Sequence, residues 1–194
     1  MSMSTSNNLL EPMAIVDIAC EFAGDIHSAT DLWQELQDNR DVSSATPRDR
    51  NLLLNSITGA KSPDGRSRSF NTDATGYAKG DSLGLILMKR LNDGERDGDR
   101  IYCVFGDALS SHNGNEDKTN FVVPSAVGQI RLLTNIYSRI NFDAQRIFYI
   151  EAHSTGTPVG DPIEANCSGP FFNQSSLGPP LLIDSSKSNL GYTE

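Results

Sequence analysis

Two short apolar runs that each end in a polar turn place the strongest constraint on the fold of this chain. Residues 147–151 lead into the Gly- and Thr-rich turn 153–160, and residues 181–184 lead into the polar turn 185–194. The segment between the runs is long enough for a helix and a return connection, so we expect parallel, neighbouring strands. Both turns then emerge at one edge of a sheet, where the active residues of α/β proteins often lie.

The rest of the chain also alternates predicted strands with predicted helices, which favours the α/β fold class. Short apolar runs rich in β-forming residues indicate strands, and apolar residues at three- and four-residue spacing indicate amphipathic helices. A further helix is expected after Gly160, with Asp161 as its N-cap and Pro162 at its first position. The charged stretch 92–100 is expected to be a connection. The expected strands are 13–20, 83–91 and 101–105, and the expected helices are 31–36 and 127–140.

Charge and composition exclude several classes of partner. The chain has 16 Lys and Arg against 25 Asp and Glu, a net charge of −9 and a pI near 4.7. This balance argues against nucleic acid and anionic membranes as partners. The apolar runs are far shorter than the ~20 residues of a membrane span. Residues 1–12 are expected to be a disordered tail, and they show no features of a signal or transit peptide.

The cysteine pattern points to a reducing compartment. Cys20, Cys103 and Cys167 are widely spaced, odd in number and form no CxxC pair. Such thiols are typical of cytoplasmic proteins, and their spacing does not suggest a metal site. A cytoplasmic location is therefore expected, with each cysteine a small, buried apolar side chain.

Two residues in the polar turns are candidates for chemistry, although each also has an ordinary interpretation. A single histidine such as His153 is more often a hydrogen-bonded structural residue than a catalyst. Lys187, in a polar turn, is most simply a solvated cation. Their positions after apolar strands favour a functional role, because the hydroxyl and N–H groups of residues 154–157 are suited to bind a carbonyl or amide oxygen.

Several segments together are similar to one protein family. Residues 151–165, EAHSTGTPVGDPIEA, and residues 186–194, SKSNLGYTE, resemble the EAHGTGTxxGDPIEA and KSNxGHxE segments of β-ketoacyl synthases. These are the ketosynthase domains of polyketide and fatty-acid synthases. Residues 14–24 resemble the family's AIVGIACRFPG opening, and residues 62–70 and 76–82 follow its SPDGRxxxF and GYxRGEG segments. The resemblance covers most of residues 13–194.

The resemblance implies a thiolase-like fold, in which two similar halves pack as α-β-α-β-α layers. Only part of this fold is expected here, because the chain is similar to fragments of the family pattern. Residues 13–50 would begin the N-terminal half, residues 51–100 would end it, and residues 101–194 would begin the C-terminal half. The final strands of the family are expected to be missing.

The resemblance also implies an acyl-transfer reaction, the decarboxylative condensation of acyl and malonyl thioesters. The substrates would be carried on the phosphopantetheine of an acyl carrier protein, with no cofactor bound directly to the chain. In the family, a cysteine thiolate takes the acyl group, and two histidines stabilise the oxyanion that forms as carbon dioxide leaves. Carried over by position, the first histidine is His153. The supporting lysine is Lys187, tied to Glu164, and Asn189 is a further supporting residue. Thr155 and Thr157 would contact the pantetheine arm.

Two departures from the family pattern bear on activity. The TACSSS-like segment that carries the nucleophile is missing between Arg50 and Asn51, and none of the three cysteines stands in its place. Tyr192 occupies the position of the second histidine, and a phenol donates one hydrogen bond but carries no positive charge. Loss of a nucleophile lowers acyl-transfer rates by several powers of ten, and loss of an oxyanion donor lowers them by ~10²–10³. No condensation is expected.

Three hypotheses for function remain open. The first is a truncated ketosynthase domain with little or no activity of its own. The second is a non-catalytic interaction module that pairs with a synthase subunit or an acyl carrier protein, or forms a homodimer. The third keeps partial chemistry, with His153 and Lys187 promoting decarboxylation or thioester hydrolysis. Strands without neighbours are expected to expose apolar faces, which makes the chain prone to aggregate unless a partner covers them.

Overall fold

The structure is a computed structural model that describes residues 11–42, 61–112, 123–172 and 180–193. Most of the expected disordered tail and the junction between Arg50 and Asn51 lie outside these residues. No helix in the described ranges is long and apolar enough to cross a membrane.

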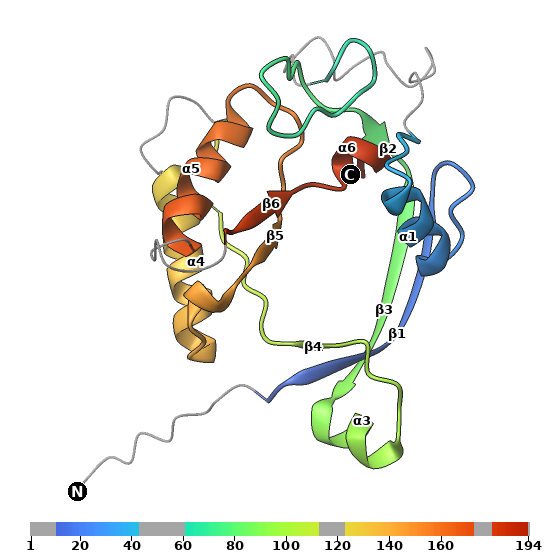
Figure 1. Cartoon of the computed structure of the whole chain (residues 1–194). Helices are drawn as coiled ribbons and strands as arrows, with labels where there is room; N and C mark the ends of the chain where they lie inside the picture. Colours follow the sequence, from blue (N-terminus) through green and yellow to red (C-terminus); the bar gives the residue numbers. More distant parts are fainter. Residues whose placement is uncertain (1–10, 43–60, 113–122, 173–179, 194) are drawn as a thin grey trace, which may run out of the picture.

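A three-stranded antiparallel sheet forms one side of the molecule (Figure 1). The central strand is β1 (Met13–Phe22), with β3 (Ser82–Arg90) on one side and β4 (Cys103–Phe105) on the other. The three strands predicted from the apolar runs are therefore confirmed. Their antiparallel pairing does not follow from the alternation of strands and helices, because it depends on how the chain returns between them.

The charged stretch after β3 is a short helix, not the irregular connection that was expected. Helix α3 (Leu91–Asp97) ends at Gly98, whose φ of 71° is left-handed. Opposite charges three residues apart support it, since Asp93 pairs with both Arg90 and Arg96. Hydrogen bonds from Arg96 and from the lysine at the end of β3 lower the pKa of Asp97 to about 2. These pairs favour a helical turn within the charged stretch that was expected to be a connection.

A second sheet carries the two polar turns. Strands β5 (Tyr149–Glu151) and β6 (Leu182–Asp184) are parallel, with Glu151 opposite Asp184. Both turns therefore leave the same edge of this sheet, which confirms the prediction from the sequence. Ser186 binds the Glu151 carboxylate through its backbone N–H at 2.8 Å and its hydroxyl at 2.7 Å, so the two strand ends are joined directly.

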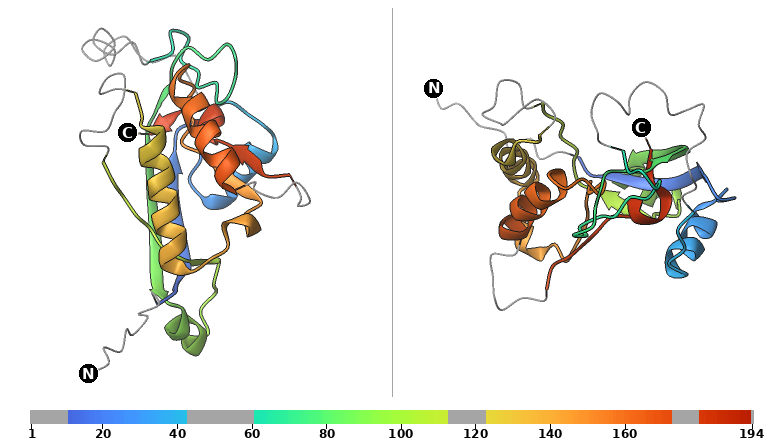
Figure 2. Two further views of the ribbon diagram at one scale, coloured as in Figure 1. Left: turned by 90° about the vertical axis from the view of Figure 1, so that its left-hand side faces the viewer. Right: turned by 90° about the horizontal axis from the view of Figure 1, so that it is seen from above.

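Two helices pack side by side next to the β5–β6 sheet (Figure 2). Helix α4 (Ala126–Ile140) begins at Ser125, whose hydroxyl accepts a hydrogen bond from the Gly128 N–H, and helix α5 covers Gly160–Phe172. The ring of Tyr137 on α4 contacts both phenylalanines at the end of α5, with centroids 5.8 and 5.3 Å apart. A 3₁₀ turn, η2 (Ala144–Arg146), connects α4 to β5.

The remaining helices and strands are short and include those next to the second polar turn. Helix α1 (Ala29–Gln37) follows β1 and begins at Ser28, whose hydroxyl accepts a hydrogen bond from the backbone N–H of Asp31. Near the end of the chain, α6 (Lys187–Leu190) leads into β7 (Tyr192–Thr193), which pairs in parallel with β2 (Lys79–Gly80). The segment before β3 therefore lies against the second polar turn.

The buried core is small, and β3 lies largely outside it. Fully buried apolar residues include Ala14 and Ile26, both near β1. In contrast, β3 exposes large side chains along its whole length, among them Leu85 and Ile86, which are 58% and 59% exposed. The expectation that unpartnered strands expose apolar surface is confirmed for this strand.

Gly94, inside helix α3, and Gly98, its C-cap, are expected to respond in opposite directions when changed to alanine. An added Cβ at Gly98 meets no atom within 4 Å, but the left-handed φ remains unfavourable, so Gly98→Ala should cost about 1–2 kcal/mol. At Gly94 the Cβ would make ordinary contacts with Val16, Ala14 and Ile101 at 3.7–3.8 Å, so Gly94→Ala should stabilise by about 0.5–1 kcal/mol. Urea denaturation followed by circular dichroism measures both changes. A shift of the same sign in both variants would contradict this description of α3.

Candidate active site

Helix α5 holds the turn after β5 through Glu164. One carboxylate oxygen accepts the backbone N–H of His153 and the other accepts that of Ser154, both at 2.8 Å. The expected ion pair between Glu164 and Lys187 is not formed in the described part of the chain. Instead, the Lys187 ammonium lies 3.5 Å from the carbonyl oxygen of Ala152. Lys187 thus supports the strand end just before His153, and Glu164 fixes the backbone of the turn itself.

Asp161 organises the rest of this turn from a buried position, with only 4% of its surface exposed. Because α5 begins at Gly160, Asp161 lies within the first helical turn and is not the N-cap that was expected. Its carboxylate faces back towards the loop. The groups that donate to it are the hydroxyl of Ser154 at 2.7 Å and the backbone N–H groups of Phe70 at 3.0 Å, Gly156 at 3.2 Å and Thr157 at 3.2 Å.

Ser154 stands where the family pattern has a glycine, and its environment explains why a side chain is accepted there. The residue is buried, and its hydroxyl donates to Asp161. Its carbonyl oxygen accepts a hydrogen bond from the hydroxyl of Ser69 at 2.6 Å. The extra hydroxyl therefore has a partner and leaves no buried polar group unsatisfied at this position.

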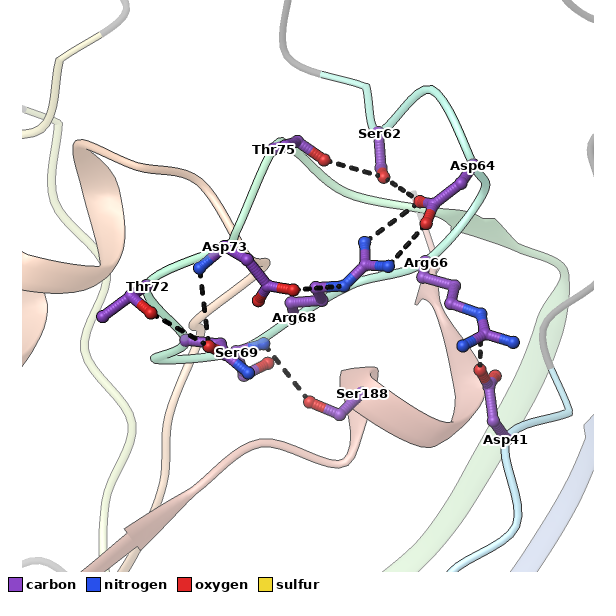
Figure 3. A network of polar contacts seen from close by, with 11 residues as sticks. Asp41, Ser62, Asp64, Arg66, Arg68, Ser69, Thr72, Asp73, Thr75 and Ser188 are labelled. Carbon is purple, nitrogen blue, oxygen red and sulfur yellow. Dashed lines mark hydrogen bonds and ion pairs between the residues drawn. The ribbon is translucent and has the colours of Figure 1, made fainter.

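The segment 61–76 connects the two polar turns (Figure 3). Ser69 touches both of them, because its hydroxyl binds Ser154 and its backbone N–H lies 3.4 Å from the hydroxyl of Ser188. Arg68 pairs with Asp64 at 2.5 Å and with Asp73 at 3.4 Å, which ties the segment into a compact loop. Hydrogen bonds hold the pKa of the Asp64 carboxyl well below its usual range, the larger effect coming from Arg68 and the smaller from the Ser62 hydroxyl.

Three rings stand together at the mouth of the site. The backbone N–H of Tyr192 donates to the carbonyl oxygen of Ala78 at 2.7 Å, which fixes the tyrosine as the first residue of β7. Its ring meets the His153 ring edge to face, with centroids 5.2 Å apart, and meets Tyr77 in the same way at 5.3 Å. The residue at the position of the family's second histidine is therefore packed directly against the first.

These elements enclose a cavity of about 370 Å³. Five of the seven predicted site residues line it, namely His153, Thr155, Thr157, Glu164 and Tyr192. Lys187 and Asn189 do not. Asn189 binds the segment after α1. Its side-chain amide donates to the Arg40 carbonyl oxygen at 2.9 Å, and its backbone carbonyl oxygen accepts the Val42 N–H at 2.9 Å.

Five of the ten residues that line the cavity were not predicted as site residues, namely Tyr77, Pro124, Gln129, Gly160 and Asp161. Tyr77 belongs to segment 76–82, and only the similarity of this segment to the family pattern could have indicated that it lies in the site. Gln129 is an ordinary polar residue in the first turns of α4, and the sequence gives no reason to expect it there. Tyr77 and Gln129 reach the cavity through tertiary packing, which cannot be inferred from the spacing of apolar residues along the sequence.

Comparison with known proteins identifies the family. The profile of the β-ketoacyl synthase C-terminal domain matches residues 102–194. Residues 102–194 correspond to the C-terminal domain of the β-ketoacyl synthases. The chain is 46% identical over 136 residues to the probable polyketide synthase 3 of Dictyostelium discoideum, covering 69% of this chain and 5% of that protein. It is 35% identical over 196 residues to a phenolphthiocerol/phthiocerol polyketide synthase chain of Mycobacterium tuberculosis, covering 96% and 10%.

Solved ketosynthase structures have the same fold. Ketosynthase twelve of the bacillaene synthase of Bacillus amyloliquefaciens aligns with a TM-score of 0.78 at 18% identity, over 94% of this chain and 60% of that one. The module 6 ketosynthase of Bacillus subtilis 168 aligns with a TM-score of 0.67 at 29% identity, over 84% and 30%. The chain therefore has a thiolase-like fold that corresponds to part of a ketosynthase domain. It spans only a small part of the curated synthases that it matches.

No cysteine is among the described residues that line the cavity around His153. Cys20 lies half-buried on β1, Cys167 is buried in α5, and Cys103 on β4 is exposed. The expectation that all three are buried is therefore confirmed only for Cys167. It is wrong for Cys20 and for Cys103, and Cys103 is exposed because β4 is an outer strand of the three-stranded sheet. Burial is the main cause that raises the pKa of Cys20 and of Cys167, which makes both thiols poorer sources of a thiolate.

The role of Asp161 can be tested against an exposed aspartate of the same region. Asp161→Asn replaces a charged acceptor of four hydrogen bonds by an amide, and we expect a loss of about 2–3 kcal/mol in folding stability. Asp73→Asn removes an exposed partner of Arg68 and should cost at most about 1 kcal/mol. Thermal denaturation of both variants gives the comparison. If the two losses are equal, Asp161 does not organise the turn.

Proposed function

We propose that this chain is a ketosynthase-family domain that binds malonyl and acyl thioesters but does not condense them. The observation that carries the proposal is the cavity around His153 and Tyr192, whose described lining retains groups that bind a carbonyl oxygen and includes no thiol. Condensation requires a thiolate that first takes the acyl group. A site with the oxyanion side alone can bind a thioester without forming an acyl-enzyme.

The substrates in this proposal are thioesters on the phosphopantetheine of an acyl carrier protein. Thr155 and Thr157 line the cavity next to His153, which supports the proposal that their hydroxyls contact the amides of the pantetheine arm. Glu164 binds the backbone of the His153 turn, and Lys187 lies against the carbonyl oxygen of Ala152 just before it. Asn189 joins α6 to the segment after α1. The carrier protein is thus the proposed partner. A cytoplasmic setting accords with the three free thiols.

Slow decarboxylation of a malonyl thioester is the chemistry that this site best supports. The bond between the α-carbon and the carboxylate breaks, carbon dioxide leaves, and the electron pair passes to the thioester oxygen as an enolate. Water then returns a proton to the α-carbon and an acetyl thioester results. A hydrogen bond from His153 stabilises the charge on that oxygen as it develops. Tyr192, 5.2 Å from His153 between ring centroids, can donate only one further hydrogen bond.

The absence of an acyl-enzyme is directly measurable. After incubation with an acyl or malonyl carrier thioester, intact-mass spectrometry should find the chain unmodified, and no β-ketoacyl product should form. A stoichiometric acyl group on Cys20, Cys103 or Cys167 would refute the proposal. Titration calorimetry with malonyl-pantetheine should detect binding that weakens in His153→Ala, and absence of binding to either protein would also refute it.

Restoring the second histidine is expected to raise the rate of carbon dioxide release. Tyr192→His places an imidazole donor at the same position, and we expect a gain on the order of tenfold with malonyl-pantetheine. Tyr102→His, at a half-exposed tyrosine outside the cavity, is the matched control and should leave the rate unchanged. Radiolabelled carbon dioxide release measures all three proteins. An equal gain in both variants, or no gain in Tyr192→His, would contradict a role for residue 192 at the reacting oxygen.

A further inference from the structure

The cavity around His153 has an acidic lining. The carboxylates of Asp161 and Glu164 belong to it, and no lysine or arginine is among the described residues that line it. A malonyl thioester brings a further carboxylate, and its repulsion by the two carboxylates of the wall disfavours entry. A malonyl group in this cavity therefore needs a hydrogen-bond donor for its carboxylate that is not a lysine or an arginine.

Most polar groups of the lining are already engaged. The carboxylates of Asp161 and Glu164 accept hydrogen bonds from the turn after β5, and an ionised carboxylate cannot donate one to a ligand. In the proposed function, His153 binds the thioester oxygen, and Thr155 and Thr157 bind the pantetheine arm. None of these groups is left to bind the malonyl carboxylate.

Gln129 is the donor of the lining that is best suited to a carboxylate. It is half-buried in the first turns of α4, the helix that packs beside α5. Its backbone N–H donates to the Ser125 carbonyl oxygen at 3.0 Å, but its side-chain amide has no hydrogen-bond partner within the described ranges. An amide offers two N–H donors, whereas each tyrosine of the lining, Tyr77 or Tyr192, can donate only one hydrogen bond.

We propose that Gln129 binds the carboxylate of a malonyl thioester and thereby selects this substrate over a simple acyl thioester. This role rests on the proposed thioester binding and adds to it the group that recognises the charge. A neutral amide suits the reaction, because the carboxylate leaves as neutral carbon dioxide. A cation here would stabilise the charge on the carboxylate, which the reaction must move to the thioester oxygen. Gln129 thus governs which thioester binds, and His153 governs the rate.

The placement of Gln129 agrees with this division of roles. The groups proposed to bind the thioester oxygen are His153, after β5, and Tyr192, at the start of β7, whereas Gln129 comes from α4. All three line the same cavity of about 370 Å³. A malonyl thioester likewise has two ends that accept hydrogen bonds, the thioester oxygen and the carboxylate. Donors from separate elements suit such a ligand, because holding both ends orients the bond that breaks.

Titration calorimetry with malonyl-pantetheine and acetyl-pantetheine tests the proposal on the full chain. The two ligands share the uncharged pantetheine arm and differ in the carboxylate. Gln129→Leu removes the donors and should weaken malonyl-pantetheine binding by about tenfold to a hundredfold, as expected for a hydrogen bond to a charged group. Gln129→Glu keeps the shape but adds a third carboxylate, so it should weaken malonyl-pantetheine binding at least as much. Acetyl-pantetheine should bind both variants as it binds the wild type.

Asn135→Asp is the matched control for Gln129→Glu. Asn135 lies on the same helix, is exposed and does not line the cavity. The control therefore also converts an amide to a carboxylate and gives the same net charge, and it should leave both affinities unchanged. Circular dichroism checks that the variants are folded. Because Gln129→Leu and Gln129→Glu differ in chemistry, either one decides the question if the other does not fold.

The possible results separate the role of Gln129 from the proposed thioester binding. Equal weakening of both ligands would make Gln129 a structural support of the cavity and overturn the proposal. An unchanged affinity for malonyl-pantetheine in the Gln129 variants would also overturn it, while thioester binding itself would stand. If the wild type binds neither ligand, the proposed function fails, and the role of Gln129 fails with it.

Discussion

The buried carboxylate of Asp161 is the interaction on which the site depends. It accepts hydrogen bonds from backbone groups of its own loop and from Phe70, which is 91 residues away in the sequence. A turn as tight as 153–157 leaves several N–H groups without partners in regular structure, and buried donors must be satisfied. Glu164 lies three residues further along α5, on the same side of the helix, and accepts the two N–H groups that Asp161 does not reach. The carboxylates of Asp161 and Glu164, near the start of α5, are therefore two fixed acceptors that hold the backbone of the His153 loop.

The cavity follows from this arrangement, since the loop that carries His153 is held on two further sides. Ser69 bridges it to α6, and the ion pairs of Arg68 keep the Ser69 segment compact. The β2–β7 pairing then brings Tyr192 against the His153 ring. The electron-rich face and the positive edge of aromatic rings favour this perpendicular contact, so the geometry is stable without a direct hydrogen bond between the two side chains.

The sequence predicted those features that are encoded locally. The strands before the two turns, their parallel pairing and helix α4 follow from short-range patterns of apolar residues, and the structure contains them. The hub role of Asp161 and the bridging role of Ser69 were not predictable in this way, because each depends on contacts between segments 85–91 residues apart. Cys103 illustrates the same limit, since a strand can be recognised from its residues while its burial depends on what packs against it.

Retention of the site and exposure of β3 are compatible because they rest on different contacts. The groups that build the cavity come from the segments 61–80, 124–164 and 184–193, and each of their main interactions is satisfied within these segments. The β1–β3 ribbon contributes none of the cavity-lining side chains. Apolar surface on β3 therefore imposes a need for a neighbour without disturbing the loop around His153. The loop around His153 is thus held by local hydrogen bonds, while β3 leaves apolar surface exposed elsewhere in the described structure.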